Sequence, residues 1–132
     1  MNENSVYVQT NDAGRNEVLA FGRAADGTLA PQGAVATGGL GTGKPHLASQ
    51  SSVALSDDGC HLLVVNAGSD DVSLLAVERG GVRLSDRVAS GGTAPTSVAV
   101  SGPLVYVLNN GNASIAGFRI GRSSPRTGAS LT

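Results

Sequence analysis

Residues 62–77 read LLVVNAGSDDVSLLAV and residues 105–120 read VYVLNNGNASIAGFRI, and the two stretches align without a gap. In each stretch a short apolar run ends at an asparagine, a glycine follows two residues later, and a second apolar run then begins. Short apolar runs separated by turn residues are typical of β-hairpins. The offset of 43 residues between the two stretches indicates an internal repeat.

The repeat covers most of the chain. A third copy begins at Val6 as VYVQTNDAGRNEVLAF, with two extra residues in its turn, and short alternating segments at 52–56 and 97–101 precede the other two copies. A four-stranded unit of roughly 40 to 45 residues has the length of one propeller blade, whereas ankyrin and tetratricopeptide repeats are shorter and contain helices. The sequence therefore predicts an all-β fold, a partial β-propeller of about two and a half four-stranded antiparallel blades.

The repeat boundaries give the expected domain organisation. We expect one propeller domain over residues 1–120, with blade one at 5–36, blade two at 51–88 and blade three at 96–120, and with the first strands of blades two and three at equivalent inner positions. Blade one has no segment that could form its innermost strand. Residues 121–132 lose the apolar alternation and are expected to form a polar tail, so the chain is interpreted as a propeller truncated at both ends.

Composition argues against several classes of partner. Nine basic and ten acidic residues give a net charge of −1, which does not favour binding to nucleic acid. The lone cysteine, Cys60, forms no internal disulfide or cysteine metal cluster, and the acidic pairs 57–58 and 70–71 lie where turns need aspartate. We therefore expect no metal site and no cofactor.

The chain shows no sign of a membrane span or a secretion signal. Its apolar runs are far shorter than the roughly 20 residues that a membrane helix requires. Residues 1–5 are polar and contain no basic and apolar leader, so we expect a cytoplasmic protein as the sequence is written, or a secreted one if an upstream signal segment is missing.

One strand and several loop motifs carry a resemblance to a known family. Residues 105–109, VYVLN, resemble the YVTN strand of the lactonase-family, 6-phosphogluconolactonase-like β-propellers. The motifs TGGLGTG at 37–43, SDDG at 56–59 and VNAGS at 65–69 are similar to one bacterial subgroup of that family. The resemblance implies a disc of usually seven blades around a central channel. It also implies hydrolysis of a sugar-acid lactone, or action on muconate-type substrates.

The expected site departs from the family pattern at two places. Family members often have a histidine just before the innermost strand of a blade, where this chain has Ser52, and Asn-Tyr-Gly after the second strand, where it has Asn-Ala-Gly at 66–68. The nearest histidine is His46, in the longer loop between blades one and two, and we take it as the candidate that activates water. Lys44 and Gln50 of the same loop are the candidate substrate-binding residues.

Two functional hypotheses remain open at this point. In the first, the complete propeller hydrolyses a sugar-acid lactone at the channel mouth, and its ligand is a small-molecule lactone or a sugar acid. In the second, it is a non-catalytic binding or scaffold module, and Lys44, His46 and Gln50 are solvated loop residues. Under either hypothesis, the isolated 132-residue chain is expected to be marginally stable or to self-associate through its open blade faces, because repeat units depend on neighbours to bury their apolar surfaces.

Overall fold

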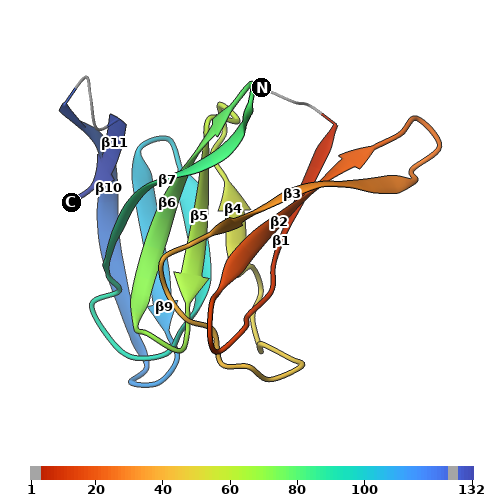
Figure 1. Ribbon diagram of the computed structural model, residues 1–132. Helices are drawn as coiled ribbons and strands as arrows, with labels where there is room; N and C mark the ends of the chain where they lie inside the picture. Colours follow the sequence, from red (N-terminus) through yellow and green to blue (C-terminus); the bar gives the residue numbers. More distant parts are fainter. Residues whose placement is uncertain (1–3, 125–127) are drawn as a thin grey trace.

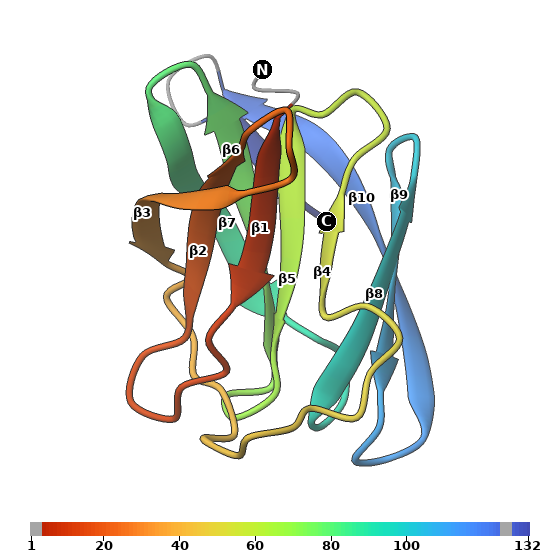
Figure 2. The ribbon, with the colours of Figure 1, turned by 90° about the vertical axis from the view of Figure 1, so that its right-hand side faces the viewer.

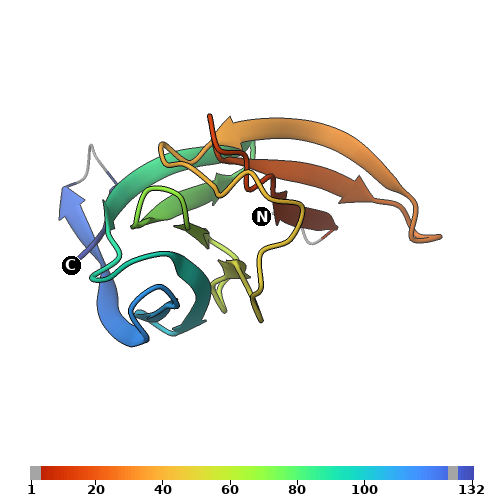
Figure 3. The same cartoon turned by 90° about the horizontal axis from the view of Figure 1, so that it is seen from below.

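The computed structural model describes residues 4–124 and 128–132, and its elements are antiparallel β-strands in three sheets (Figure 1). Seen from below, the sheets follow one another in chain order (Figure 3). Within the described residues, no helix is long and apolar enough to cross a membrane. Blade one is a three-stranded sheet of β1 (Ser5–Gln9), β2 (Glu17–Arg23) and β3 (Leu29–Ala36).

Blades two and three are four-stranded sheets with the same strand order. Blade two comprises β4 (Val53–Leu55), β5 (His61–Asn66), β6 (Asp71–Glu78) and β7 (Gly81–Ala89). Blade three comprises β8 (Pro95–Ser101), β9 (Leu104–Asn109), β10 (Ser114–Ser124) and β11 (Gly128–Leu131). All neighbouring strands pair antiparallel, and the pairs Asn66↔Asp71 and Asn109↔Ser114 occupy equivalent places in the repeat. The predicted all-β, partial-propeller fold is therefore confirmed.

The first strands of blades two and three lie side by side. β4 and β8 are each the end strand of a sheet, and the backbone N–H of Val98 donates to the carbonyl of Ser51 at 2.8 Å (Figure 2). We call this side of the molecule, formed by β4 and β8, the inner edge. The predicted equivalence of these two strands is confirmed.

The interpretation of residues 121–132 as a strandless tail is wrong. β10 continues to Ser124, and β11 pairs with it through Ile120↔Leu131 and Arg122↔Ala129, which completes blade three with a fourth strand. The strand is held by tertiary contacts: Leu131 is buried in the core, and its N–H donates to Asp86 Oδ2 at 2.8 Å. Pro125 and its neighbours up to 127 lie outside the described residues.

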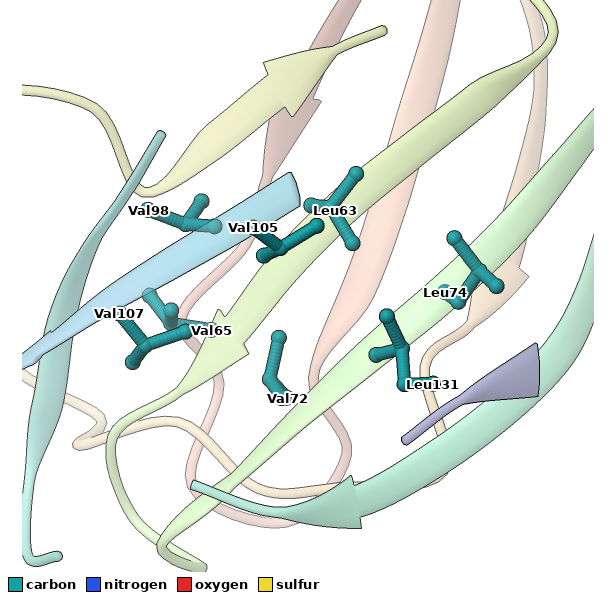
Figure 4. Close-up of a cluster of buried hydrophobic side chains, with 8 residues drawn as sticks. All are labelled: Leu63, Val65, Val72, Leu74, Val98, Val105, Val107 and Leu131. Atoms are coloured by element: carbon teal, nitrogen blue, oxygen red, sulfur yellow. The ribbon is translucent and has the colours of Figure 1, made fainter. Parts of the chain in front are cut away.

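Blade two is buried on both faces, and this is where the core lies. Successive residues of β5 point to opposite sides, as strand geometry requires, so Leu63 and Val65 pack against blade three while Leu62 and Val64 pack against blade one. Figure 4 shows the cluster between blades two and three, which consists of Leu63, Val65, Val72, Leu74, Val98, Val105, Val107 and Leu131. Burying each of the leucines contributes about 1.5–3 kcal/mol.

The turn before β5 shows why aspartate and glycine recur at such places. Asp58 Oδ1 accepts hydrogen bonds from the Ser56 hydroxyl at 2.6 Å and from the backbone N–H of Cys60 at 2.9 Å. The Ser56 bond, followed by the Cys60 bond, lowers the pKa of Asp58, because both favour the charged carboxylate. Gly59 has a φ of 71°, a conformation that costs glycine little, so the predicted turn role of this segment is confirmed.

Candidate functional site

The connection between blades one and two is longer than its equivalent between blades two and three. Residues 37–52 link β3 to β4, whereas residues 90–94 suffice to link β7 to β8. The longer segment, which we call the bridging loop, crosses the end of the sheets at the bottom of Figure 2 and carries all three candidate site residues. Its hydrogen bonds anchor it to each of the three blades in turn.

The first anchor is on blade two and belongs to the repeat. The N–H of Gly68 donates to the carbonyl of Leu40 at 2.9 Å, and the N–H of Leu40 donates to the Ser69 hydroxyl at 2.8 Å. The shorter connection makes the same backbone contact on blade three, where Gly111 donates to Thr93 at 2.9 Å. This anchor is therefore common to both connections between blades and is not specific to the bridging loop.

The second anchor is on the turn between β1 and β2 of blade one, where it involves more groups than the bonds to Asp70 by which the shorter connection is held on blade two. Asn11, in the turn between β1 and β2, donates through Nδ2 to the Thr42 hydroxyl at 2.6 Å and accepts from the Thr42 N–H at 2.9 Å. Gly41 and Gly43 donate their backbone N–H groups to the carbonyls of Asp12 and Asn11, at 2.7 and 2.8 Å. A Cβ at Gly41 would collide with the Asn11 backbone, so this close approach requires glycine.

The third anchor is on blade three. The N–H of Gln50 donates to the Ser97 hydroxyl at 3.3 Å, and the hydroxyls of Ser49 and Ser97 lie 3.2 Å apart. Residues 45–48, between the second and third anchors, form no hydrogen bond with any described residue. The bridging loop is thus fixed on both sides of a short exposed apex.

The three predicted site residues share this loop, but their side chains are not brought together by direct bonds. Lys44, His46 and Gln50 are all exposed. Lys44 and Gln50 are held through main-chain atoms, since the Lys44 carbonyl accepts from Asn11 Nδ2 at 3.3 Å. No hydrogen bond or ion pair within the described part of the chain joins their side chains, so their assignment to a site stays a prediction.

Polar side chains from blades one and three bond the end of the bridging loop at the inner edge. Gln9 of blade one donates through Nε2 to the carbonyl of Ser52, the last residue of the loop, at 3.5 Å, and the Ser97 hydroxyl of blade three accepts from the Gln50 N–H at 3.3 Å. Sequence reasoning missed Gln9 and Ser97. The repeat itself holds a signal for Gln9, because the equivalent positions in blades two and three are the apolar residues Val65 and Leu108.

A buried amide network holds the start of the bridging loop between blades one and two. Asn66 donates through Nδ2 to Asp71 Oδ1 at 2.7 Å and to the Ser73 hydroxyl at 2.9 Å. Its Oδ1 accepts from Asn16 Nδ2 at 2.9 Å and from the Thr37 hydroxyl at 2.7 Å. All five side chains are buried, so each hydrogen bond forms away from competing water.

An ion pair extends this network to the surface. Arg87 Nη1 lies 2.6 Å from Asp71 Oδ2, and the arginine side chain is half-exposed. The Asp71 carboxylate therefore has a partner for each oxygen, Asn66 on one and Arg87 on the other. Paired in this way, Asp71 fixes the orientation of Asn66 within blade two and is not available as a general base.

The equivalent asparagine of blade three is bonded differently. Asn109 Nδ2 donates to the Ser90 carbonyl at 2.9 Å, but its buried Oδ1 has no hydrogen-bond partner among the described residues. The position that supplies Asn16 in blade one is occupied here by Asp70, whose carboxylate instead accepts from the Ala94 N–H at 2.7 Å. A carboxylate oxygen cannot donate to Asn109 Oδ1 in place of the Asn16 amide.

A cavity of about 340 Å³ lies apart from the bridging loop, between blade one and the β6–β7 hairpin. Its walls combine apolar side chains, including Tyr7 and Val82, with the polar side chains of Gln32 and Glu78. None of the three predicted site residues lines it. No three His, Cys, Asp or Glu residues of the described chain are grouped so that they could hold a metal ion.

Comparison with known proteins assigns this architecture to a family. A family model described as lactonase, 7-bladed beta-propeller, matches residues 1–129. A periplasmic gluconolactonase of Pseudomonas aeruginosa aligns with a TM-score of 0.67 and 23% identity, over 96% of this chain and 35% of its own. A functionally unknown protein from Desulfotomaculum acetoxidans aligns with a TM-score of 0.68 and 19% identity, over 100% of this chain and 42% of its own.

The two neighbours are related to the chain by fold and differ greatly from it in length. The chain spans 35% and 42% of their lengths. At identities below 25% the likeness concerns the fold. Among curated proteins, no sequence matches the chain.

Proposed function

Since the chain belongs to the lactonase family of seven-bladed β-propellers, we propose that it contributes three blades to a propeller that hydrolyses a sugar-acid lactone. The observation that carries the proposal is that polar side chains of blades one and three converge at the inner edge on the loop that bears His46. Propeller sites assembled across blades need such a convergence.

The proposed chemistry is addition of water to the lactone carbonyl followed by ring opening. His46 accepts a proton as the water oxygen attacks the carbonyl carbon, which gives a tetrahedral oxyanion. The bond between this carbon and the ring oxygen then breaks, and the imidazolium returns its proton to the leaving alkoxide. The Lys44 ammonium and the Gln50 amide are the local donors that would bind the oxyanion and the sugar acid.

The inner edge suits a ligand rich in hydroxyl groups. Gln9, Ser52 and Ser97 contribute neutral amide, carbonyl and hydroxyl groups there. The Gln9 amide is bonded through both of its polar atoms, so the Ser97 hydroxyl is the group with capacity for a further bond to a ligand. One of the neighbouring structures is named a gluconolactonase, and its name supports a sugar-acid lactone as the substrate class. The three blades supply part of a ring, so we expect the 132-residue chain to bind such a ligand and to turn it over slowly or not at all.

The proposal is tested by titrating the isotopically labelled chain with glucono-δ-lactone and with gluconate while recording amide NMR spectra and proton release. We expect shifts confined to the bridging loop and the inner edge, weakened in His46→Ala. The matched control is His61→Ala, because His61 is the other histidine of the chain and opens β5, outside the bridging loop. Unchanged spectra at millimolar ligand would refute the proposal.

A second candidate is a non-catalytic binding module, and the cavity between blades one and two favours it. A volume of about 340 Å³ falls within the range of small-molecule pockets. The same titration separates the two candidates. Shifts centred on Tyr7 and Val82, with none in the bridging loop, would support the binding module and contradict the lactonase proposal.

A further inference from the structure

Blade three has a large apolar face that nothing in the described structure covers. On β9 the residues alternate strictly: Val105 and Val107 are buried against blade two, while Tyr106 and Leu108 on the opposite face are 51% and 40% exposed. Ile115 of β10, which pairs with Leu108, is 72% exposed. We call the face that contains Leu104, Tyr106, Leu108 and Ile115 the open face of blade three.

The residues of this face are neighbours in the sheet. Tyr106 pairs with Ala99 on one side and with Gly117 on the other, so the aromatic ring stands between two small residues. The tyrosine ring atoms lie 3.4 Å from where a Cβ of Gly117 would be. Contiguous exposed apolar surface of this kind marks an interaction site.

The internal repeat shows what such a face binds. Leu63, Val65 and Val72 of blade two are equivalent to Tyr106, Leu108 and Ile115, and all three are fully buried. They are covered by the next blade, through Val98, Val105 and Val107 among others. The equivalent surface within the same chain is therefore a blade-docking face.

Blade one supplies the matching surface. Tyr7 and Val18 pack against blade two, so strand alternation turns Val6, Val8, Leu19 and Phe21 to the other side. Val8 is 43% exposed. We call this the open face of blade one. Its residues Val6, Val8 and Phe21 are equivalent to Leu62, Val64 and Leu75, which face the preceding blade in the interface between blades one and two.

We propose that the 132-residue chain associates head to tail, the open face of blade three of one copy docking on the open face of blade one of a second copy. Each contact would continue the pattern of the two inter-blade interfaces already present within the chain. Because the two surfaces differ, the contact is heterologous, and every assembly that has not closed into a ring keeps one face of each kind free at its ends. The assembly therefore grows with concentration. This association is independent of lactone hydrolysis.

The test uses two variants, each with one open face blocked by a charge. Ile115→Lys blocks the blade-three face and Val8→Lys the blade-one face, while Leu55→Lys on β4 is the control, with a similar exposure of 48% but on the central blade. In sedimentation velocity, wild type and Leu55→Lys should grow with concentration. Each blocked variant alone should remain monomeric over the concentrations at which wild type associates, because its association constant is lowered roughly tenfold or more. Tyr106→Lys serves as a second blade-three variant if Ile115→Lys does not fold.

Mixing the two blocked variants gives the decisive result. Each retains one intact face, so an equimolar mixture should form a 1:1 dimer and stop there. A dimer formed by Val8→Lys alone would show a symmetric contact between two blade-three faces and overturn the head-to-tail arrangement. A wild-type chain that stays monomeric at all concentrations would overturn the proposal as a whole.

Discussion

Replacing Asn66 with alanine should destabilise the fold far more than the same replacement at Asn109, its equivalent in the next repeat. The Asn66 side chain takes part in four hydrogen bonds, to Asp71, Ser73, Asn16 and Thr37, and it is fully buried. A net contribution of roughly 1 kcal/mol for each bond gives a loss of about 3–4 kcal/mol in the free energy of unfolding.

The loss stays within this range because the partners keep other bonds. Asn16 Nδ2 still donates to Gln9 Oε1 at 2.7 Å, and Asp71 Oδ1 still accepts from the Ser69 hydroxyl at 3.0 Å. The full penalty for leaving a buried group unpaired is therefore not incurred. Asn109, in contrast, makes one side-chain bond and leaves its Oδ1 unpaired among the described residues, so its removal should cost about 1 kcal/mol or less.

Both variants should be made in the Ile115→Lys background, so that association does not contribute to the measured stability. Urea unfolding at pH 7, followed by far-ultraviolet circular dichroism, gives the free energy of unfolding of each variant. Losses that agree within about 0.5 kcal/mol, or a larger loss for Asn109→Ala, would refute the assignment of the amide network as the main polar link between blades one and two.

Three further outcomes are expected. Gly68→Ala should lower the free energy of unfolding by about 2 kcal/mol or more, because its Cβ would collide with the Gly41 carbonyl. The control Gly80→Ala has open space around its Cβ and should change the free energy of unfolding by less than about 0.5 kcal/mol. Equal effects of the two substitutions in urea unfolding would contradict the close approach of Gly68 to Gly41. Leu63→Ala should cost about 2–5 kcal/mol in the same assay, and a value near zero would show that the core between blades two and three is not closed. Hydrogen bonds lower the folded-state pKa of Asp58, so its charged form stabilises the fold above the ordinary value of 3.8, and this contribution is lost as pH falls through the folded-state pKa. The deficit of Asp58→Asn should therefore be present at pH 7 and shrink as the pH is lowered below 3.8, and a deficit that grows on acidification would be inconsistent with the bond geometry.

Much of the fold could be predicted because the copies of the repeat share both the alternation of apolar residues and the positions of the turns. The second strands, β5 and β9, end at the asparagines that close the first apolar run of each aligned stretch, and a Gly-containing turn follows each of them. β11 was missed because Gly128, Ala129 and Ser130 are small or polar and leave Leu131 as the one large apolar residue of the strand. Pairing with β10 and burial of that leucine stabilise the strand, and neither is visible in local sequence.

Less of the candidate site could be predicted. The unusual length of the connection between blades one and two identified the bridging loop, but its anchors join residues far apart in sequence. Asn16 and Thr37 contact Asn66 from 50 and 29 residues away, and hydrogen bonds at such separations follow from the packing of blades. His46 makes no hydrogen bond with any described residue, so neither its sequence context nor its contacts assign it a partner.

The anchoring of the bridging loop changes how disturbances should travel through the chain. In a simple repeat array each unit touches its neighbours, so blade one could influence blade three only by way of blade two. Here a single segment is held by Asn11 of blade one and by Ser97 of blade three. Local unfolding of blade one would release this segment and so weaken its hydrogen bond to Ser97 of blade three directly. The three blades should consequently exchange their protected amide hydrogens as one cooperative unit, and not in the stepwise order of a linear array.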